Sequence, residues 1–405
     1  MISIGEGTDM MRRAKQTLTE VSFIDVIRKE LHAIFTDSGA LLIVVFAMLI
    51  YTLIYSSAYG SEVVERVSIA IVDEDNSPLS RSLVDGLRAG PNTQVRCEIN
   101  SMDVAQEMFY NHDVYGIVYI PDGFERNVVG GLQGDISLIL DGGHLLLYRQ
   151  VLEQAVADIL DAGVSIEVNR LIVQGNNNIE SIVEPVIFDN HILYNPSLGY
   201  GSFVMPTILI VIIQQTMLIG IAMVRLRRKS TIISGSSITL LSAAKYVAAK
   251  MIVYIALYAI NLTIILSAIW PLFGFTYAGS VIDIAALLFI YMVAVAALGI
   301  TISHLFARRE APLVMLLRCS VPLLLLAGVS YPREAFPEWL YILGRIIPSS
   351  SAVDAFVAIG SMGASLGDRL HDIILLLILA IFYLVLAIII EYRGYKVKKI
   401  IKHNE

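Results

Sequence analysis

Polar side chains interrupt three long apolar runs of this sequence. Gln214 and Gln215 stand side by side in one run, Asn261 lies in a second and Arg318 in a third. Inside a lipid bilayer such groups are costly, and they either line a path for a solute or bond to a neighbouring helix. We therefore take these four residues as a candidate translocation path. The alternatives are interhelical hydrogen bonds for the amides and, for Arg318, a side chain that extends to the inner surface.

The sequence offers no site for nucleotide or metal chemistry. It has no GxxxxGK[ST] loop for nucleotide phosphates and no HExxH pair for zinc. Its two cysteines and seven histidines show no metal-binding spacing, so we expect neither a metal site nor a cofactor. The apolar runs also lack the Asp, Glu or His relay of a proton-coupled carrier. Energy for any transport must then come from another chain, and we expect no enzymatic activity here.

The composition places these candidates in a membrane. Of 405 residues, 56% are hydrophobic and only 16% are charged, and the mean hydropathy is +0.70. A bilayer core of about 30 Å needs roughly 20 residues of helix. The sequence therefore predicts a polytopic α-helical membrane protein with six transmembrane helices, at 39–59, 202–224, 246–270, 281–305, 313–329 and 373–390.

The distribution of Lys and Arg predicts the orientation, because positive loops stay on the cytoplasmic side. With the N-terminus inside, the inner segments carry 17 Lys and Arg, whereas the short outer loops at 271–280 and 330–372 carry three Arg. We expect both termini to be cytoplasmic. The predicted parts are a cytoplasmic region at 1–38, a first span at 39–59, an extracytoplasmic domain at 60–200, a transmembrane domain at 201–392 with short outer helices at 331–350, and a basic tail at 393–405.

The segment 60–200 reads as an inserted α/β domain. It holds 21 Asp and Glu against seven Arg and no Lys, as suits a soluble surface. Strand-like stretches begin at 67, 93, 114 and 135, and short helical stretches lie between them. A long amphipathic helix is predicted from 144 to about 175. This order favours a small sheet with neighbouring, partly parallel strands.

Two amphipathic stretches on the cytoplasmic side could receive energy from a partner. In 21–36, one helical stripe is apolar and the other face is polar, so we expect an interfacial helix along the inner leaflet. The apolar stripe consists of Phe23, Ile24, Ile27, Leu31 and Ile34. The second stretch, 230–250, follows the basic cluster Arg225 to Lys229 that ends the second span.

Several segments of the sequence occur in the same order as in a known protein family. They are IRKELHAIFTDSG at 27–39, VSIAIVDEDNSPLSRSLVDGL at 67–87, NPSLGYGSFVMP at 195–206, the loop before KYVAAK at 245–250, and IIPSSSAVDAF at 346–356. In order and spacing around six spans, the chain resembles the membrane subunits (permeases) of the ABC-2 family of ATP-binding-cassette exporters. The resemblance is to the subgroup with a large extracytoplasmic domain between the first two spans, and it covers nearly the whole chain.

The resemblance implies partners and a mechanism. It implies a dimer of such subunits, identical or paralogous, on two separate ATP-binding subunits that bind the ATP, with a periplasmic adaptor as a further candidate partner and membrane lipid around it. It also implies that the loop between the second and third spans docks into the ATPase. The candidate coupling residues are Ile233, Ser236, Ser237, Ile238, Leu240 and Leu241 in this loop, and Arg28, Lys29 and Glu30 in the interfacial helix at 21–36.

We therefore expect a multi-pass permease in the bacterial cytoplasmic (inner) membrane that exports an amphipathic or lipophilic solute. The first alternative is a membrane-anchored receptor whose outer domain binds a partner without transport. A secondary carrier is the second, disfavoured by the missing charge relay and the absence of a visible repeat between the halves. No feature points to nucleic acid.

Overall fold

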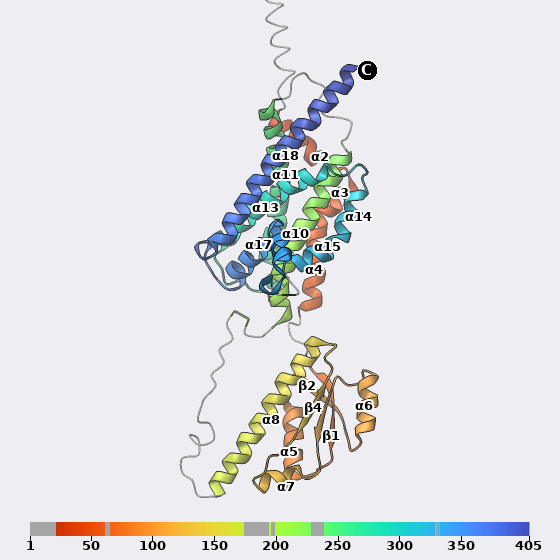
Figure 1. The fold of residues 1–405 in the computed structure, drawn as a ribbon, viewed down its shortest axis with the longest axis vertical. Helices are drawn as coiled ribbons and strands as arrows, with labels where there is room; N and C mark the ends of the chain where they lie inside the picture. The colour runs from red at the N-terminus through yellow and green to blue at the C-terminus, as the bar shows by residue number, and fades with distance from the viewer. Residues whose placement is uncertain are drawn as a thin grey trace, which may run out of the picture. The chain divides into compact units, whose positions relative to one another are not determined.

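The computed structural model describes residues 22–60, 65–173, 194, 195, 199–227, 239–328, 331 and 333–404. Its contacts divide the chain into two compact units. We call the first the helical unit, formed by Met1–Glu62 and Leu193–Glu405, and the second the α/β unit, formed by Val63–Ile192 (Figure 1). Each unit is described by itself.

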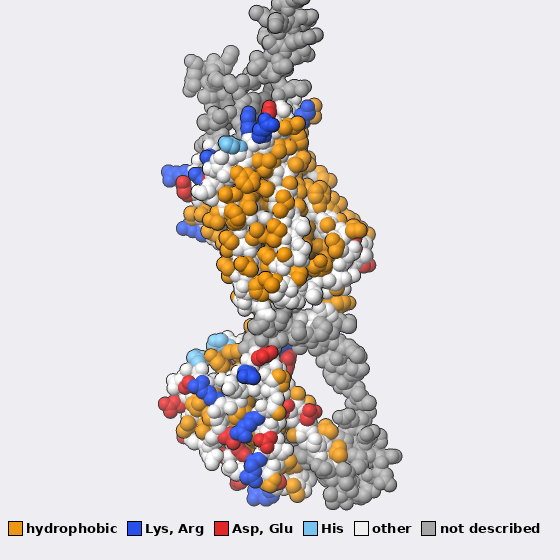
Figure 2. Space-filling model, turned by 180° about the vertical axis from the view of Figure 1, so that it is seen from behind, with side chains coloured by type: hydrophobic (Ala, Val, Ile, Leu, Met, Phe, Trp, Pro, Cys, Tyr) orange, Lys and Arg blue, Asp and Glu red, His pale blue; other side chains and the backbone are white. Residues whose placement is uncertain are grey.

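The helical unit contains five helical runs that are long and apolar enough to cross a membrane. They are Ser38–Tyr59, Tyr200–Arg227, Leu240–Leu272, Val281–Ser303 and Leu366–Gly394. Their elements are α3 (Ser38–Leu41), the π-helix η1 (Leu42–Phe46), α4 (Ala47–Tyr59), α10 (Tyr200–Arg227), α11 (Leu240–Ile264), the π-helix η2 (Ile265–Ile269), α12 (Trp270–Leu272), α13 (Val281–Ser303), the 3₁₀ helix η5 (Leu366–Arg369) and α18 (Leu370–Asn404). The chain is thus a polytopic helical membrane protein, and five of the predicted spans coincide with these runs. Apolar side chains cover the visible face of this unit (Figure 2).

The span predicted at 313–329 is not one continuous helix. Its described part forms α14 (Ala311–Arg318) and α15 (Ser320–Leu326), which meet at Cys319. Pro322 explains the break, because a proline lacks the backbone N–H and its ring clashes with the carbonyl group four residues earlier, here that of Arg318. Hydropathy detected the apolar composition of this segment but not its interruption.

A second pair of short helices continues the interrupted segment. After the 3₁₀ helix η3 (Arg333–Ala335) come α16 (Glu338–Arg345), α17 (Pro348–Phe356) and the π-helix η4 (Val357–Ser361), with a bend of 89° between α16 and the α17–η4 run. The Ser350 hydroxyl donates to the carbonyl of Leu326 at the end of α15, at 3.1 Å. At the other end, the Gly360 carbonyl accepts from Ala278 N–H, at 2.8 Å, in the loop between α12 and α13.

We expect the short helices at 331–350 on the outer side, and this position stays a prediction. At their C-terminal end, the Ser349 N–H in the first turn of α17 donates to Gln214, near the middle of α10. The α17–η4 run therefore extends from the middle of α10 to the α12–α13 loop. Together with α14 and α15 it forms a broken segment, held by neighbouring helices that bond its exposed backbone groups.

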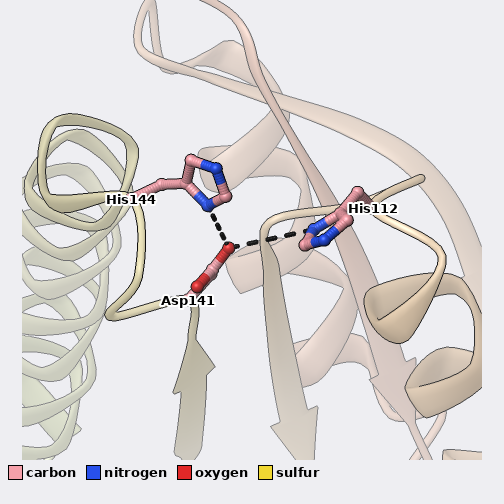
Figure 3. A group of neighbouring side chains, drawn as sticks. All are labelled: His112, Asp141 and His144. Atoms are coloured by element: carbon pink, nitrogen blue, oxygen red, sulfur yellow. Dashed lines mark hydrogen bonds and ion pairs between the residues drawn. The ribbon is translucent and has the colours of Figure 1, made fainter.

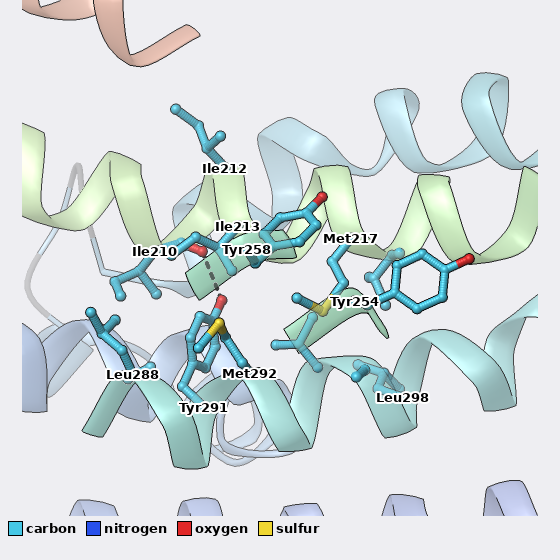
Figure 4. Close-up of a cluster of buried hydrophobic side chains, with 14 of the residues drawn as sticks. Ile210, Ile212, Ile213, Met217, Tyr254, Tyr258, Leu288, Tyr291, Met292 and Leu298 are labelled. Carbon is cyan, nitrogen blue, oxygen red and sulfur yellow. Dashed lines mark hydrogen bonds between the residues drawn. The ribbon is translucent and has the colours of Figure 1, made fainter. Parts of the chain in front are cut away.

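The core of the helical unit is built around α10, whose apolar window is entirely buried within this unit. This helix contacts α4, α13, α14 and α17. Three tyrosines, Tyr254, Tyr258 and Tyr291, are among the largest fully buried side chains (Figure 4). The Tyr291 hydroxyl donates to the Ile210 carbonyl at 2.7 Å, which ties α13 to α10 and satisfies a polar group that burial would otherwise leave costly.

The α/β unit has a four-stranded sheet in the order β2-β1-β3-β4. The strands are β1 (Val67–Asp73), β2 (Thr93–Ile99), β3 (Gly116–Ile120) and β4 (Ser137–Leu140); β1 is parallel to β2 and β3, and β4 is antiparallel to β3. One face packs against α5 (Pro78–Ala89), α7 (Phe124–Val129) and α8 (Leu145–Val173), and the other packs against α6 (Met102–Tyr110). The alternation of strands and short helices follows the expectation from the sequence.

Candidate functional site

One end of the helical unit brings together charged residues from segments far apart in the chain. It contains α2 (Phe23–Phe35), the end of α10, the start of α11, the loop after α13 and a part of α18. We call it the basic end. Lys and Arg side chains gather there on the face seen in Figure 2.

The helix α2 is amphipathic, as predicted, but its apolar surface is divided between two environments. Val26 is buried against Tyr246 and Ala249 of α11. Ile24 and Phe35, by contrast, are 66% and 55% exposed. Of the predicted apolar stripe, Ile34 is thus buried in the helical unit, whereas Ile24 stays exposed. Exposed apolar side chains beside a packed face suit a helix that contacts both protein and lipid.

A buried acidic group lies at the centre of the packed face. Glu30 has no exposed surface, and its Oε1 accepts a hydrogen bond of 3.0 Å from the Tyr254 hydroxyl. The Nζ atom of Lys250, which is 2% exposed, lies 4.0 Å from the same oxygen and over the ring of Tyr246. Since an unpaired charge in such surroundings is strongly unfavourable, Glu30 and Lys250 hold α2 and α11 in one arrangement.

Asp37 is a second charged junction of the basic end. Its side chain caps α3 by accepting from Gly39 N–H and Ala40 N–H, and it pairs with Arg227 of α10 and Arg309 of the loop after α13. Burial acts to raise the pKa of Asp37, but the Ala40 N–H bond and the two guanidinium groups outweigh it, so the pKa is lowered. Asp37 is thus an ionised link between three segments.

Further contacts close the same end. The guanidinium of Arg225 donates to the Ser303 carbonyl at 2.9 Å, and Nε2 of His304 lies 3.6 Å from the carboxylate of Glu391 in α18. Arg227 and Thr239, which flank segment 228–238 in the chain, both lie at this end.

The structure describes part of the predicted coupling set. Ile233, Ser236, Ser237 and Ile238 lie outside the described residues. Leu240 and Leu241 are 56% and 65% exposed, and they form the first turn of α11, which begins six residues before the predicted third span. Thr239 caps this helix by accepting from Ser242 N–H. Arg28 and Lys29 are exposed on α2, whereas Glu30 is buried.

The two glutamines of the predicted path differ in their contacts. Gln214 Oε1 accepts from Ser349 N–H, at 3.1 Å, and so satisfies a backbone donor at the start of α17. Gln215 is 8% exposed, and neither side-chain atom has a hydrogen-bond partner among the described residues. A buried amide without a partner calls for an explanation, such as a ligand or a second subunit.

The other two path candidates lie in different surroundings. Asn261 donates to the carbonyl of Val45 at 3.0 Å, within the π-helix η1, and so forms an interhelical hydrogen bond. Arg318 is exposed and ends α14. None of the contacts described here brings either residue together with Gln214 or Gln215.

Comparison with known proteins adds the family. The model of the family described as "ABC-2 family transporter protein" matches residues 38–389. The chain belongs to this family. No solved structure matches it.

Two curated relatives resemble this ABC-2 family member over most of their length. The probable multidrug ABC transporter permease YbhR of Escherichia coli K12 is 25% identical over 84% of this chain and 90% of its own. The inner membrane transport permease YhhJ of the same strain is 24% identical over 83% of this chain and 87% of its own.

Sequence reasoning missed several residues of this ABC-2 chain that the structure brings together. Lys250, Asp37, Arg309 and Glu391 were given no partners from the sequence. Their partners are distant in sequence, so no spacing could reveal them. Ser349 had a local signal, since the preceding Pro348 is typical of the first position of a helix.

Proposed function

We propose that this chain is the membrane-spanning permease subunit of an ABC-2 exporter. It moves an amphipathic or lipophilic solute out across the bacterial cytoplasmic membrane, and ATP hydrolysed by a separate subunit drives the movement. The observation that carries the proposal is the family match over residues 38–389, a range that reaches into all five continuous apolar runs. The relatives named as permeases, one of them a probable multidrug permease, support the same class.

The proposed assembly contains two permease subunits and two ATP-binding subunits. The second permease subunit is an identical copy or a paralogue, and a periplasmic adaptor is a further candidate. The chain itself holds no cofactor and hydrolyses no ATP, in keeping with its lack of a GxxxxGK[ST] loop.

Coupling is proposed to take place at the basic end. Segment 228–238, Leu240 and Leu241 contact the ATP-binding subunit, and Arg28 and Lys29 on α2 extend the contact surface. The buried Glu30–Lys250 pair makes α2 and the first half of α11 one mechanical unit. A displacement at the start of α11 would then move α2 with it, and through Asp37 it would reach the ends of α3 and α10.

The path is proposed to run beside the broken segment. There the first turn of α17 is bonded to Gln214 of α10. The next residue of α10 is Gln215, whose amide has no partner among the described residues. Interrupted helices with their first turn near the membrane midplane are a recurrent way to build a solute site. Asn261 and Arg318 stay secondary candidates for this path.

The proposed orientation follows the charges. With 17 Lys and Arg in the segments of the basic end and the termini against three in the short opposite loops, the basic end and both termini face the cytoplasm. The five continuous runs and the broken segment make six crossings, an even number, so that both termini lie on the same side. The acidic α/β unit, which follows the first crossing, then lies in the periplasm.

The test is purification of the chain from its native membrane in a mild detergent. We expect a co-eluting chain that carries GxxxxGK[ST], and ATP hydrolysis that a Lys→Ala change in that motif abolishes. The isolated chain should neither bind nor hydrolyse ATP. Micromolar ATP binding by the chain alone, or elution without any ATP-binding chain, would overturn the proposal.

A further inference from the structure

Three segments of the α/β unit bring two imidazoles to one carboxylate. His112 follows α6, Asp141 follows β4, and His144 directly precedes α8 (Figure 3). Nδ1 of His144 lies 2.6 Å from Oδ2 of Asp141, and Nδ1 of His112 lies 4.0 Å from the same oxygen. One ligand atom from each residue lies within 4.8 Å of the others.

The backbone holds each of these residues in place. Asp141 N–H donates to the carbonyl of Tyr115 at 3.2 Å, and this bond fixes the end of β4 beside β3. The His144 carbonyl accepts from Tyr148 N–H at 2.9 Å, as part of the first turn of α8. The His112 N–H donates to the carbonyl of Phe109 in α6 at 3.1 Å, and the φ angle of His112, +57°, lies in the left-handed region.

The two oxygens of Asp141 have different surroundings. Oδ1 accepts from Gly143 N–H at 2.8 Å, which orients the carboxylate. Oδ2 faces both imidazoles. A hydrogen bond with one histidine accounts for the contact with His144, but His112 at 4.0 Å is too far for a hydrogen bond, so a second imidazole at this oxygen has no role in a simple Asp–His pair.

The donor set has a definite metal preference. Two imidazole nitrogens and one carboxylate oxygen suit Zn²⁺, Cu²⁺, Ni²⁺ or Fe²⁺ rather than Ca²⁺ or Mg²⁺. Bonds of about 2.0–2.1 Å place neighbouring ligand atoms roughly 3–3.5 Å apart, so the observed separations require shifts of about 1 Å. The side chains of His112 and His144 are 61% and 52% exposed, which leaves room for water to complete the coordination. The two rings also contact each other and Tyr115, which keeps both of them near Asp141.

We propose that His112, Asp141 and His144 bind one divalent transition-metal ion of the Zn²⁺ class on the surface of the α/β unit. The sequence shows no sign of this site because His112 and Asp141 are 29 positions apart in different elements. Only the sheet, which pairs the start of β3 with the end of β4, brings the two loops together. The site is independent of the proposed coupling and path residues.

Zinc titration of the full chain tests this proposal. The chain is purified in detergent with an affinity tag that contains no histidine, stripped with a chelator, and titrated with ZnCl₂ in a calorimeter. We expect one Zn²⁺ per chain, and at least tenfold weaker binding in each of His112→Asn, Asp141→Asn and His144→Ala. Asn suits the left-handed backbone at 112, and at 141 it keeps the acceptor for Gly143 N–H, so these variants preserve the local fold.

The control is His32→Ala, which removes an exposed histidine of α2 and should leave Zn²⁺ binding unchanged. Electron paramagnetic resonance of bound Cu²⁺ gives a second readout: two nitrogen ligands in the unchanged chain and one in His144→Ala. The proposal is overturned if the unchanged chain binds no Zn²⁺, or if the three site variants bind it as tightly as the His32→Ala chain.

Discussion

Lys250 and Glu30 carry opposite charges at a place from which water is excluded. Their distance of 4.0 Å and their burial mean that each charge depends on the other. Replacement of one partner leaves a buried unpaired charge, which typically costs about 3–5 kcal/mol, whereas replacement of both by apolar groups of similar volume is often neutral. The pair is therefore a sensitive place to separate stability from coupling.

We expect Lys250→Met to lower the thermal unfolding midpoint of the detergent-solubilised chain markedly, and the double change Glu30→Leu with Lys250→Met to recover most of the loss. The measurement is thermal unfolding followed by tryptophan fluorescence. The single variant Glu30→Leu is measured as well. If the decreases in unfolding midpoint of Glu30→Leu and Lys250→Met simply add in the double variant, Glu30 and Lys250 do not interact as described.

Asp37 gives a prediction about pH. Its pKa is lowered in the folded chain, so its ionised form stabilises the fold above the unfolded pKa of about 3.9, and this contribution disappears as the pH falls through the lower folded pKa. Asp37→Asn keeps the helix cap but loses the charge that faces Arg227 and Arg309.

At pH 7 we expect Asp37→Asn to unfold several degrees below the unchanged chain. As the pH falls below about 4 and then through the lower folded pKa, the two midpoints should converge, because Asp37 finally becomes neutral in the folded chain as well. Thermal unfolding at a series of pH values measures this. A difference that stays constant down to pH 3 would show that the lost contacts are not ionic.

At the scale of elements, the broken segment links the fold to the proposed path. The first turn of α17 depends on Gln214 for one of its backbone donors, whereas Gln215 has no partner among the described residues. These neighbouring glutamines form a matched pair. Loss of an acceptor from a buried N–H costs about 1–3 kcal/mol, but removal of an unpartnered buried amide does not.

We therefore expect Gln214→Leu to lower the unfolding midpoint and Gln215→Leu to leave it unchanged or raise it. If Gln215 contacts the solute, Gln215→Leu should still reduce transport at least several-fold, measured as ATP-dependent uptake of a lipophilic fluorescent dye into inverted membrane vesicles. A Gln215→Leu chain with normal transport would remove this residue from the path, and a destabilised one would reveal a partner for its amide.

Comparison of the predicted with the observed helices shows how far the sequence alone could lead. Five spans were found from hydropathy because each is a continuous apolar run of sufficient length. The run at 313–329 misled the same reasoning, since composition does not reveal the break that Pro322 imposes. For α2, periodicity identified an amphipathic helix, but only the packing against α11 shows that Glu30 lies on the buried face. Long-range pairs such as Asp37 with Arg309 leave no local signal at all.

At the scale of the whole molecule, we propose that a separate ATPase acts on the basic end. Leu241 offers the sharpest probe among the described coupling residues, because its side chain is 65% exposed in the first turn of α11. Leu241→Asp should leave insertion and folding intact, since the new carboxylate lies in water when the chain is alone. In the complex it would be buried without a partner, which typically costs several kcal/mol.

The most direct test measures ATP hydrolysis and co-purification of the partner with three chains: the unchanged one, Leu241→Asp, and Leu132→Asp as a control. Leu132 belongs to the α/β unit and is 69% exposed, so the same substitution there should change neither quantity. We expect Leu241→Asp to release the ATP-binding subunit or to abolish the dependence of its ATPase rate on this chain. Each 1.4 kcal/mol of penalty weakens the affinity between the two subunits about tenfold. Normal partner stoichiometry together with a normal ATPase rate in Leu241→Asp would contradict coupling through the start of α11.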